Sequence, residues 1–295
     1  MLREQIRQII QSSPDYAAIT PAIEKELLHH DIIDVLIKHG AMQRLTFIGG
    51  TSLRMCYNSS RLSEDLDFNG GFDFKPAEFD GLDTEIQTYI QNKYETKVWV
   101  NKPANEVLGD TVSWKISIEK ESSRPDLPRQ KMHIDVCAIP SFDVEQRALI
   151  NHYNVVVPTE GILVPVQSLQ ETLADKLIAL AYRARRIKPR DIWDIVWLKQ
   201  RGTALSPALV EQKLFARCKQ KEDFHQALQA QLNKLMSDEE VRNDFNMEMS
   251  RFIPANIKQR TVDNPEYWAY VQGEAGAIAS ELLSEGNQQK PFDMG

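Results

Sequence analysis

The sequence predicts an α/β (α+β) fold, in which a mixed-sheet domain over residues 1–165 is followed by an all-helical region over residues 166–295. Strand-like and helix-like segments alternate in the first half of the chain, whereas the later apolar residues recur at helical spacing. The change of character comes directly after Pro165. With 295 residues, 42% of them hydrophobic, the chain can bury one large core or two smaller ones.

The expected elements follow in order along the chain. We expect two helices within residues 1–40, the second over residues 21–39, and further helices over residues 51–60, 76–94 and 171–186, and from residue 190 through most of the chain to about residue 285. The helix over residues 21–39 ends at Gly40. Alternating or short apolar runs predict strands over residues 45–50, 61–68, 96–100, 111–119, 131–139 and 162–166. Because it carries proline, the last of these strands is expected at an edge of the sheet.

Composition and charge exclude several classes of protein. The net charge of −7 means that a nucleic-acid partner would need a local basic patch. The three cysteines are widely spaced, and the six histidines show no metal-ligand spacing, so we expect neither disulfides nor a zinc site. We find neither the apolar core of a signal peptide nor a membrane-spanning run, and we therefore expect a cytoplasmic protein.

The most informative segment is the predicted acidic strand over residues 61–68. On a strand, Asp65 and Asp67 point to one face, and Leu66 and Phe68 point to the other. Two carboxylates on one face repel each other unless a cation lies between them. Mg²⁺ (or Mn²⁺) binds one or two carboxylates together with phosphate oxygens, so this strand predicts a metal site for phosphoryl transfer.

A glycine turn precedes this strand. Gly49 and Gly50 let backbone amides and a helix N-terminus approach phosphate groups, and Thr51 or Ser52 caps the helix and adds a donor. On the wet face of a later strand, Asp135 is the candidate third carboxylate, either as a metal ligand or as the base that deprotonates an attacking hydroxyl.

In this order, the motifs are recognisable. The segment FIGGTSLRMCYNSSRLSEDLDF resembles the first motif of the AbiEii/AbiGii toxin family, nucleotidyltransferase-like toxins of the polymerase-β superfamily. The matching residues are Gly49, Gly50, Thr51, Leu53, Arg61, Ser63, Asp65, Asp67 and Phe68. A later family motif, a lysine-bearing helix followed by Arg-Asp-x-x-Asp, is matched by Lys176, Arg183, Arg190, Asp191 and Asp194. The resemblance spans roughly residues 20 to 200.

The resemblance implies that the chain transfers a nucleoside monophosphate from a nucleoside triphosphate to an acceptor. It further implies the toxin of a toxin–antitoxin pair used in phage defence or growth arrest, a cognate antitoxin, and RNA, particularly tRNA, as acceptor. The expected catalytic residues are Asp65, Asp67, Asp135, Lys176 and Asp194, the first three of them metal ligands. The expected nucleotide-binding residues are Gly49, Gly50, Thr51, Ser52, Arg61, Ser63, Lys176, Arg183, Arg190 and Asp191.

Other interpretations remain open at this point. Basic residues favour helix C-termini and acidic residues favour N-termini, so the charges around residues 176–194 could serve only the helix dipoles. The acceptor could be a protein or a small molecule, and the chain could be a non-catalytic nucleotide-binding module. An RNA surface would need basic residues, which gather at residues 183–190 and at Lys115, Lys120, Arg124, Arg129 and Lys131. We interpret His133, Trp193 and Trp197 as structural, and Cys137 as a small buried filler.

Overall fold

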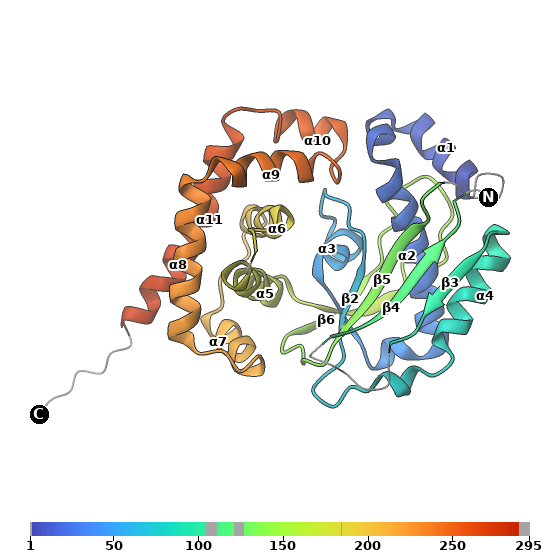
Figure 1. Ribbon diagram of the computed structural model, residues 1–295, viewed down its shortest axis with the longest axis horizontal. Helices are drawn as coiled ribbons and strands as arrows, with labels where there is room; N and C mark the ends of the chain where they lie inside the picture. The colour runs from blue at the N-terminus through green and yellow to red at the C-terminus, as the bar shows by residue number, and fades with distance from the viewer. Residues whose placement is uncertain (1, 104–110, 121–126, 184, 289–295) are drawn as a thin grey trace, which may run out of the picture. The chain divides into compact units, whose positions relative to one another are not determined.

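The computed structural model describes residues 2–103, 111–120, 127–183 and 185–288, and it divides into two compact units (Figure 1). One unit comprises Met1–Gln167 with Arg251–Asn256, and the other comprises Ser168–Ser250 with Ile257–Gly295. The short segment from late in the chain joins the first unit because the backbone N–H of Leu62 donates to the carbonyl oxygen of Phe252 at 2.8 Å. Arg124 lies outside the described residues.

The first unit begins with helices. Its helical elements are α1 (Leu2–Ser12), η1 (Pro14–Ile19), α2 (Thr20–His39), η2 (Ala41–Gln43), α3 (Gly49–Tyr57), η3 (Pro76–Phe79) and α4 (Leu82–Tyr94). Helix α2 ends as predicted at Gly40, whose φ of 86° is the left-handed conformation that glycine adopts without steric cost. The single helix expected over residues 76–94 is instead a short 3₁₀ turn and α4, separated at Gly81 with φ 88°.

Seven strands form one mixed sheet in the part of the chain that the structure describes, in the order β3-β4-β5-β2-β1-β7-β6. They are β1 (Thr46–Ile48), β2 (Leu66–Asn69), β3 (Val98–Asn101), β4 (Thr111–Ile118), β5 (Gln130–Cys137), β6 (Val144–Ala148) and β7 (Leu163–Gln167). Strand β2 runs parallel to β5 and antiparallel to β1. The expected mixed sheet is therefore confirmed.

Two strand predictions are wrong in detail. Strand β2 begins at Leu66, so the residues from Arg61 to Asp65 form a loop before it instead of part of the strand. The proline-bearing strand β7 is not at the edge, because β6 pairs with its outer side and places Gln146 opposite Pro165. Most of β6 is exposed, so it carries none of the apolar alternation by which a strand is recognised in sequence.

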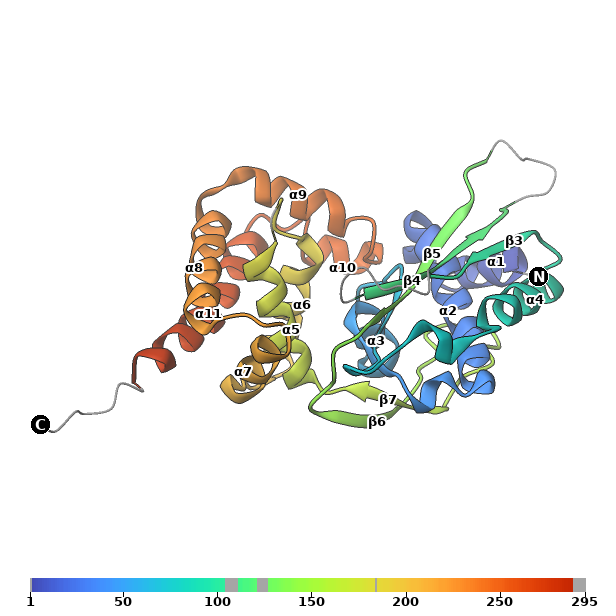
Figure 2. The same cartoon turned by 60° about the horizontal axis from the view of Figure 1, so that its bottom comes forward.

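One face of the sheet is covered by helices of the same unit (Figures 1 and 2). Helix α3 contacts β1 and β2, α4 contacts β3, and α2 contacts α4. The covered face is apolar, with the rings of Phe47 and Phe68 stacked at 5.1 Å and Trp114 only 1% exposed. On the opposite face of β4 and β5 the side chains are half-buried or exposed, as their alternating sequences predict.

The second unit is helical. It contains α5 (Leu169–Tyr182), α6 (Pro189–Gln200), α7 (Pro207–Ala216), α8 (Lys221–Ser237), α9 (Glu239–Met249) and α11 (Tyr267–Gln288), and α10 (Ala255–Arg260) begins in the first unit and ends in the second. Trp193 and Trp197 are buried, as expected, and Trp193 stacks on Phe245 with ring centroids 6.3 Å apart. Ser168 caps α5 by accepting the backbone N–H of Glu171, which starts the helix directly after β7.

Candidate active site

The glycine turn lies directly against the second carboxylate of the acidic motif. Gly49 has a φ of 78°, and a Cβ built on it would come 2.5 Å from Oδ2 of Asp67. A side chain at this position would therefore be strained by its backbone and would collide with the carboxylate. The turn between β1 and α3 thus requires glycine for the close approach, which sequence alone does not reveal.

The two hydroxyls after the turn do not cap the helix. Helix α3 begins at Gly49, its N-cap residue is Ile48, and no side chain caps it. Instead, Oγ of Ser52 donates to the carbonyl oxygen of Gly49 at 2.9 Å, and Oγ1 of Thr51 donates to that of Asp65 at 2.5 Å. The expected cap is therefore wrong, and the Thr51 hydroxyl ties the glycine turn to the acidic loop.

Asp67 and Asp135 are brought together by strand pairing. Asp67 on β2 is the register partner of Asp135 on β5, and parallel neighbours point their side chains to the same face. On the next strand, Ser113 is the register partner of Asp135, and its Oγ donates to Oδ1 of Asp135 at 2.5 Å. Asp135 thus lies on the more exposed face of β5, as the alternation of the strand predicts, and the pairing of β2 with β5 makes it a neighbour of Asp67.

Asp65 is held differently. It lies in the loop before β2, and its Oδ1 accepts the backbone N–H of His133 at 2.9 Å. The ring Nδ1 of His133 is 3.3 Å from the same oxygen, and His133 lies on the same face of β5 as Asp135. His133 therefore contacts the acidic motif, which our structural interpretation of this residue overlooked. Cys137 is half-exposed on this face and is not a buried filler.

The donor set fits a hard divalent cation in its chemistry. Asp67 and Asp135 offer carboxylate oxygens from adjacent strands, which suits Mg²⁺, because this ion binds one or two carboxylates and takes its remaining ligands from phosphates and water. Within the described ranges, however, no three acidic, histidine or cysteine side chains converge as a metal cluster. The structure pairs Asp67 with Asp135 and directs Asp65 to His133.

Two further residues of the first motif are buried behind the glycine turn. The Arg61 side chain is 2% exposed, and a Cβ on Gly50 would come 2.2 Å from its Nη2. Nη1 of Arg61 donates to the carbonyl oxygen of Leu62 at 3.1 Å, and Ser63 is 7% exposed. Gly50 is thus the position at which the turn makes room for a buried guanidinium.

The second unit holds the later motif as one buried cluster. Nζ of Lys176 on α5 lies 2.8 Å from Oδ2 of Asp194 and 3.1 Å from Oδ1 of Asp191, both on α6. Arg183, directly after α5, donates from Nε and Nη2 to Oδ2 of Asp191 at 3.1 and 2.9 Å. Asp191 and Asp194 are 5% and 0% exposed, so these charges hold α5 against α6.

The ion pairs of this cluster shift the pKa of Asp191. Burial by itself would raise the pKa of Asp191, but the adjacent charges of Lys176 and Arg183 outweigh it and lower that pKa to about 2. Lys176 and Arg183 thus both pair with the same carboxylate, that of Asp191. Arg190 instead donates to Oε1 of Glu248 on α9 at 3.1 Å.

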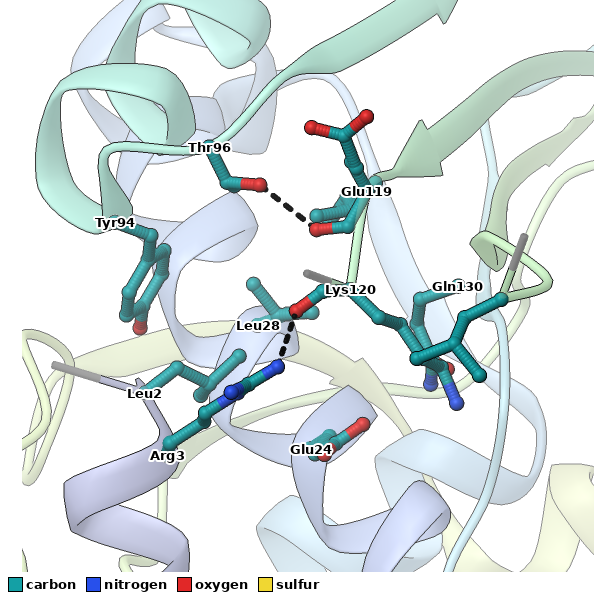
Figure 3. A pocket seen from close by; sticks show the side chains of 11 residues that line it. Leu2, Arg3, Glu24, Leu28, Tyr94, Thr96, Glu119, Lys120 and Gln130 are labelled. Atoms are coloured by element: carbon teal, nitrogen blue, oxygen red, sulfur yellow. Dashed lines mark hydrogen bonds between the residues drawn. The ribbon is translucent and has the colours of Figure 1, made fainter. Parts of the chain in front are cut away.

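A cavity of about 270 Å³ lies away from these residues, between α1, α2 and the ends of β4 and β5 (Figure 3). Arg3 donates across it to the carbonyl oxygen of Lys120 at 3.2 Å. Burial raises the pKa of Glu24 in its wall, opposed by the charges of Lys120 and Arg3. Lys120 thus lines a cavity that contains none of the predicted site residues.

The chain was compared with known protein families and solved structures. Residues 32–272 match the model of the family described as nucleotidyl transferase AbiEii toxin, type IV toxin–antitoxin system. Two solved structures also match the chain. MenT4, a nucleotidyltransferase toxin from Mycobacterium tuberculosis H37Rv, is 17% identical with a TM-score of 0.48, and the match covers 94% of this chain and 99% of that one. JHP933 from Helicobacter pylori is 15% identical with a TM-score of 0.49, over 90% and 96%.

No curated protein matches the chain significantly. None of the helices that the structure describes has the length and apolar character to span a membrane. The family match extends over most of the chain and includes both the acidic motif of the first unit and the charged cluster of the second. The chain therefore belongs to the AbiEii family of nucleotidyltransferase toxins of type IV toxin–antitoxin systems.

Proposed function

We propose that the chain is a Mg²⁺- or Mn²⁺-dependent enzyme that transfers a nucleoside monophosphate from a nucleoside triphosphate to an acceptor hydroxyl, with pyrophosphate leaving. One observation carries the proposal. The glycine turn approaches Asp67 so closely that a Cβ at Gly49 would lie 2.5 Å from the carboxylate, and Asp135 is next to Asp67 in register. A glycine turn that leads into a helix N-terminus, the kind of backbone that can bind phosphate, thus adjoins a pair of carboxylates.

The first unit supplies the reacting groups. Asp67 and Asp135 would hold the metal ion, with Asp65 as the remaining ligand of the motif. The bound ion neutralises charge on the triphosphate during phosphoryl transfer. Alternatively, Asp135 would accept the proton of the acceptor hydroxyl, and the hydrogen bond from Ser113 supports either role because it orients the carboxylate. The backbone from Gly49 to Ser52 would cradle the phosphates, with Arg61 and Ser63 supporting the turn from behind.

In the second unit, Lys176 and Arg183 are the proposed triphosphate cations, and Asp194 and Asp191 their partners. The cluster of these four side chains carries two positive and two negative charges, so an anion bound there must compete with a carboxylate. Replacing Lys176 by methionine is therefore expected to raise the Kd of the triphosphate. Arg190 links α6 to α9 through its ion pair with Glu248.

The acceptor proposed from the family is RNA, in particular tRNA, and the biological role is that of a growth-arresting or phage-defence toxin in the cytoplasm, controlled by a cognate antitoxin. The chain's net charge of −7 does not attract RNA as a whole, so acceptor binding must rely on a local basic surface.

A labelling assay tests the proposal. The protein is incubated with Mg²⁺, each α-labelled nucleoside triphosphate in turn, and either total RNA or cell lysate. Label in an RNA band that is lost in Asp67→Asn and Asp135→Asn, but kept in the matched surface variant Asp80→Asn, supports nucleotidyl transfer to RNA. Asp80 is a fair control because its side chain is 85% exposed. Label in a protein band would show that the acceptor is a protein and not RNA. If no label appears although the triphosphate still binds, the proposed catalytic roles are wrong.

A further inference from the structure

The face of the sheet opposite the helices continues from the carboxylate pair onto a basic surface. We call this surface the open face, and it consists of Trp99, Lys115, Ser117, Arg129, Lys131 and His133. Lys115, Arg129 and Lys131 are exposed, and the other three side chains are half-buried. The outer strands β3, β4 and β5 that carry it lie side by side in Figures 1 and 2.

Strand register places these residues in rows. Asp67, Asp135 and Ser113 form the first row, His133 and Lys115 the second. The third row holds Lys131, Ser117 and Trp99. At about 3.3 Å per residue, the third row lies about 13 Å along the strands from the carboxylates. A stacked nucleic-acid strand rises about 3.4 Å per nucleotide, so the surface has room for about four nucleotides.

The charge of the open face is opposite to that of the chain. Lys115, Arg129 and Lys131 bring three positive charges, and among the residues that the structure describes none of them forms an ion pair. The acidic side chain at the far rim, Glu119, is only 12% exposed and lies 3.8 Å from Lys97. In a protein of net charge −7, three such cations on one sheet face select a polyanion.

The open face also carries an aromatic platform. The guanidinium of Arg129 lies 3.8 Å from the ring centroid of the half-buried Trp99. Indole and guanidinium planes both stack on nucleobases without regard to sequence. A protein partner would instead need apolar anchors, and the large exposed apolar side chains of the chain, such as Phe72, Val156 and Phe215, are not on this face.

We propose that the open face binds a single-stranded segment of the RNA acceptor and delivers its terminal hydroxyl to Asp67 and Asp135. This inference rests on the proposed nucleotidyl transfer and adds the location and the form of the acceptor. Lys115 and Lys131 contact phosphates along the strand, and the Trp99–Arg129 pair stacks on bases beyond them. These residues position the acceptor and take no part in binding the triphosphate.

The test combines binding with kinetics. A single-stranded RNA of about eight nucleotides ending in a 3′-deoxyribose, which binds but cannot accept at that position, is titrated by fluorescence anisotropy at several salt concentrations. The double variant Lys115→Gln/Lys131→Gln is compared with Lys38→Gln/Lys234→Gln, which removes the same charge from two exposed lysines on α2 and α8. Thermal unfolding verifies that each variant is folded.

We expect the open-face double variant to weaken RNA binding, to reduce the salt slope of log K by about 1.4 for two lost phosphate contacts, and to raise the KM of the RNA acceptor. The KM of the triphosphate and the properties of the matched control should not change. Trp99→Ala should weaken binding about 5- to 150-fold, with recovery in Trp99→Tyr. This pattern supports the proposal.

Other outcomes distinguish failure of the proposed RNA-binding surface from failure of the proposed reaction. Equal effects of the two double variants, or an unchanged RNA affinity of the open-face variant, overturn the inference while nucleotidyl transfer stands. Label that enters protein and not RNA in the transfer assay has the same consequence. If RNA binding depends on the open face but no nucleotide is transferred to any acceptor, the surface is supported and the proposed reaction is overturned.

Discussion

Replacing Gly49 by alanine should inactivate the protein while leaving it folded. The new Cβ would come 2.5 Å from Oδ2 of Asp67, and ordinary contact begins at 3.4 Å, so the carboxylate must retreat by about 0.9 Å. A misplacement of about 1 Å can lower a rate about 100-fold. We therefore expect kcat for nucleotidyl transfer to fall about 100-fold and Mg²⁺ binding to weaken.

The same change strains the backbone. A non-glycine residue at the φ of 78° found at Gly49 costs about 1–2 kcal/mol, equivalent to a decrease of a few degrees in Tm. Gly161 separates this strain from the collision, because it has nearly the same φ of 76° and nothing within 4 Å of its Cβ position. Gly161→Ala should therefore lose similar stability and keep its activity.

The assay measures kcat with an α-labelled nucleoside triphosphate and the RNA acceptor, beside urea unfolding of both variants. A folded Gly49→Ala protein with kcat within about threefold of the wild type would refute the reasoning, because Asp67 would then tolerate displacement. Equal loss of activity in Gly161→Ala would show that backbone strain, and not the contact with Asp67, limits the reaction.

Three further predictions concern other parts of the molecule. Asp191→Asn removes the buried carboxylate that Lys176 and Arg183 share, leaves Lys176 with Asp194 alone, and should cost about 3–5 kcal/mol of unfolding free energy, measured in urea at pH 7. Burial lowers the pKa of His29 and His30 to about 4, so the unfolded chain takes up protons first as pH falls below about 6.5. The free energy of unfolding should therefore fall by about 2 kcal/mol per histidine between pH 7 and 5. The decrease should be smaller in His29→Gln and His30→Gln variants. Ser113→Ala removes the hydrogen bond to Asp135 and should lower kcat about tenfold with little change in the KM of the triphosphate.

Each of these changes can be checked against an internal reference. Asp263→Asn breaks an exposed pair with Lys258 and should cost less than about 1 kcal/mol, so a comparable loss at both positions would contradict the role of burial. Ser237→Ala removes an exposed hydroxyl on α8, outside the proposed sites, and should leave kcat unchanged. An unfolding free energy that does not change between pH 7 and 5 would contradict neutral buried histidines.

Much of the fold could be predicted because its signals are local. Helix α2 carries an apolar repeat and ends at a glycine, and β4 and β5 alternate strictly between apolar and polar residues. Strand β6 could not be predicted, since four of its five residues are exposed and it is held by pairing with β7. The start of β2 was misplaced because Asp65 is held by a side-chain hydrogen bond to β5, and no local pattern encodes that bond.

In the candidate site, too, features with a local sequence signal could be predicted, and features that depend on strand pairing could not. Residue type and spacing identified Asp67, and alternation identified the exposed face of Asp135. That these two are neighbours depends on the parallel pairing of β2 with β5, and parallel pairing leaves no signature in a single strand. The contact of His133 with Asp65 was missed for the same reason, although His133 is two residues from Asp135 and therefore shares its face.

The return of residues 251–256 to the first unit has a consequence for synthesis of the protein. Phe252 is 3% exposed and packs in a core cluster with Ile9, Ile23 and Leu62, which lies just ahead of the acidic motif. A ribosome that has translated Asp65 needs about 190 more codons before Phe252 is added, roughly 10 to 40 s at about 5–20 residues per second. The loop leading to the carboxylates therefore lacks one wall of its core until translation is almost finished, which delays the toxin's maturation and leaves a prematurely terminated chain with this apolar surface uncovered.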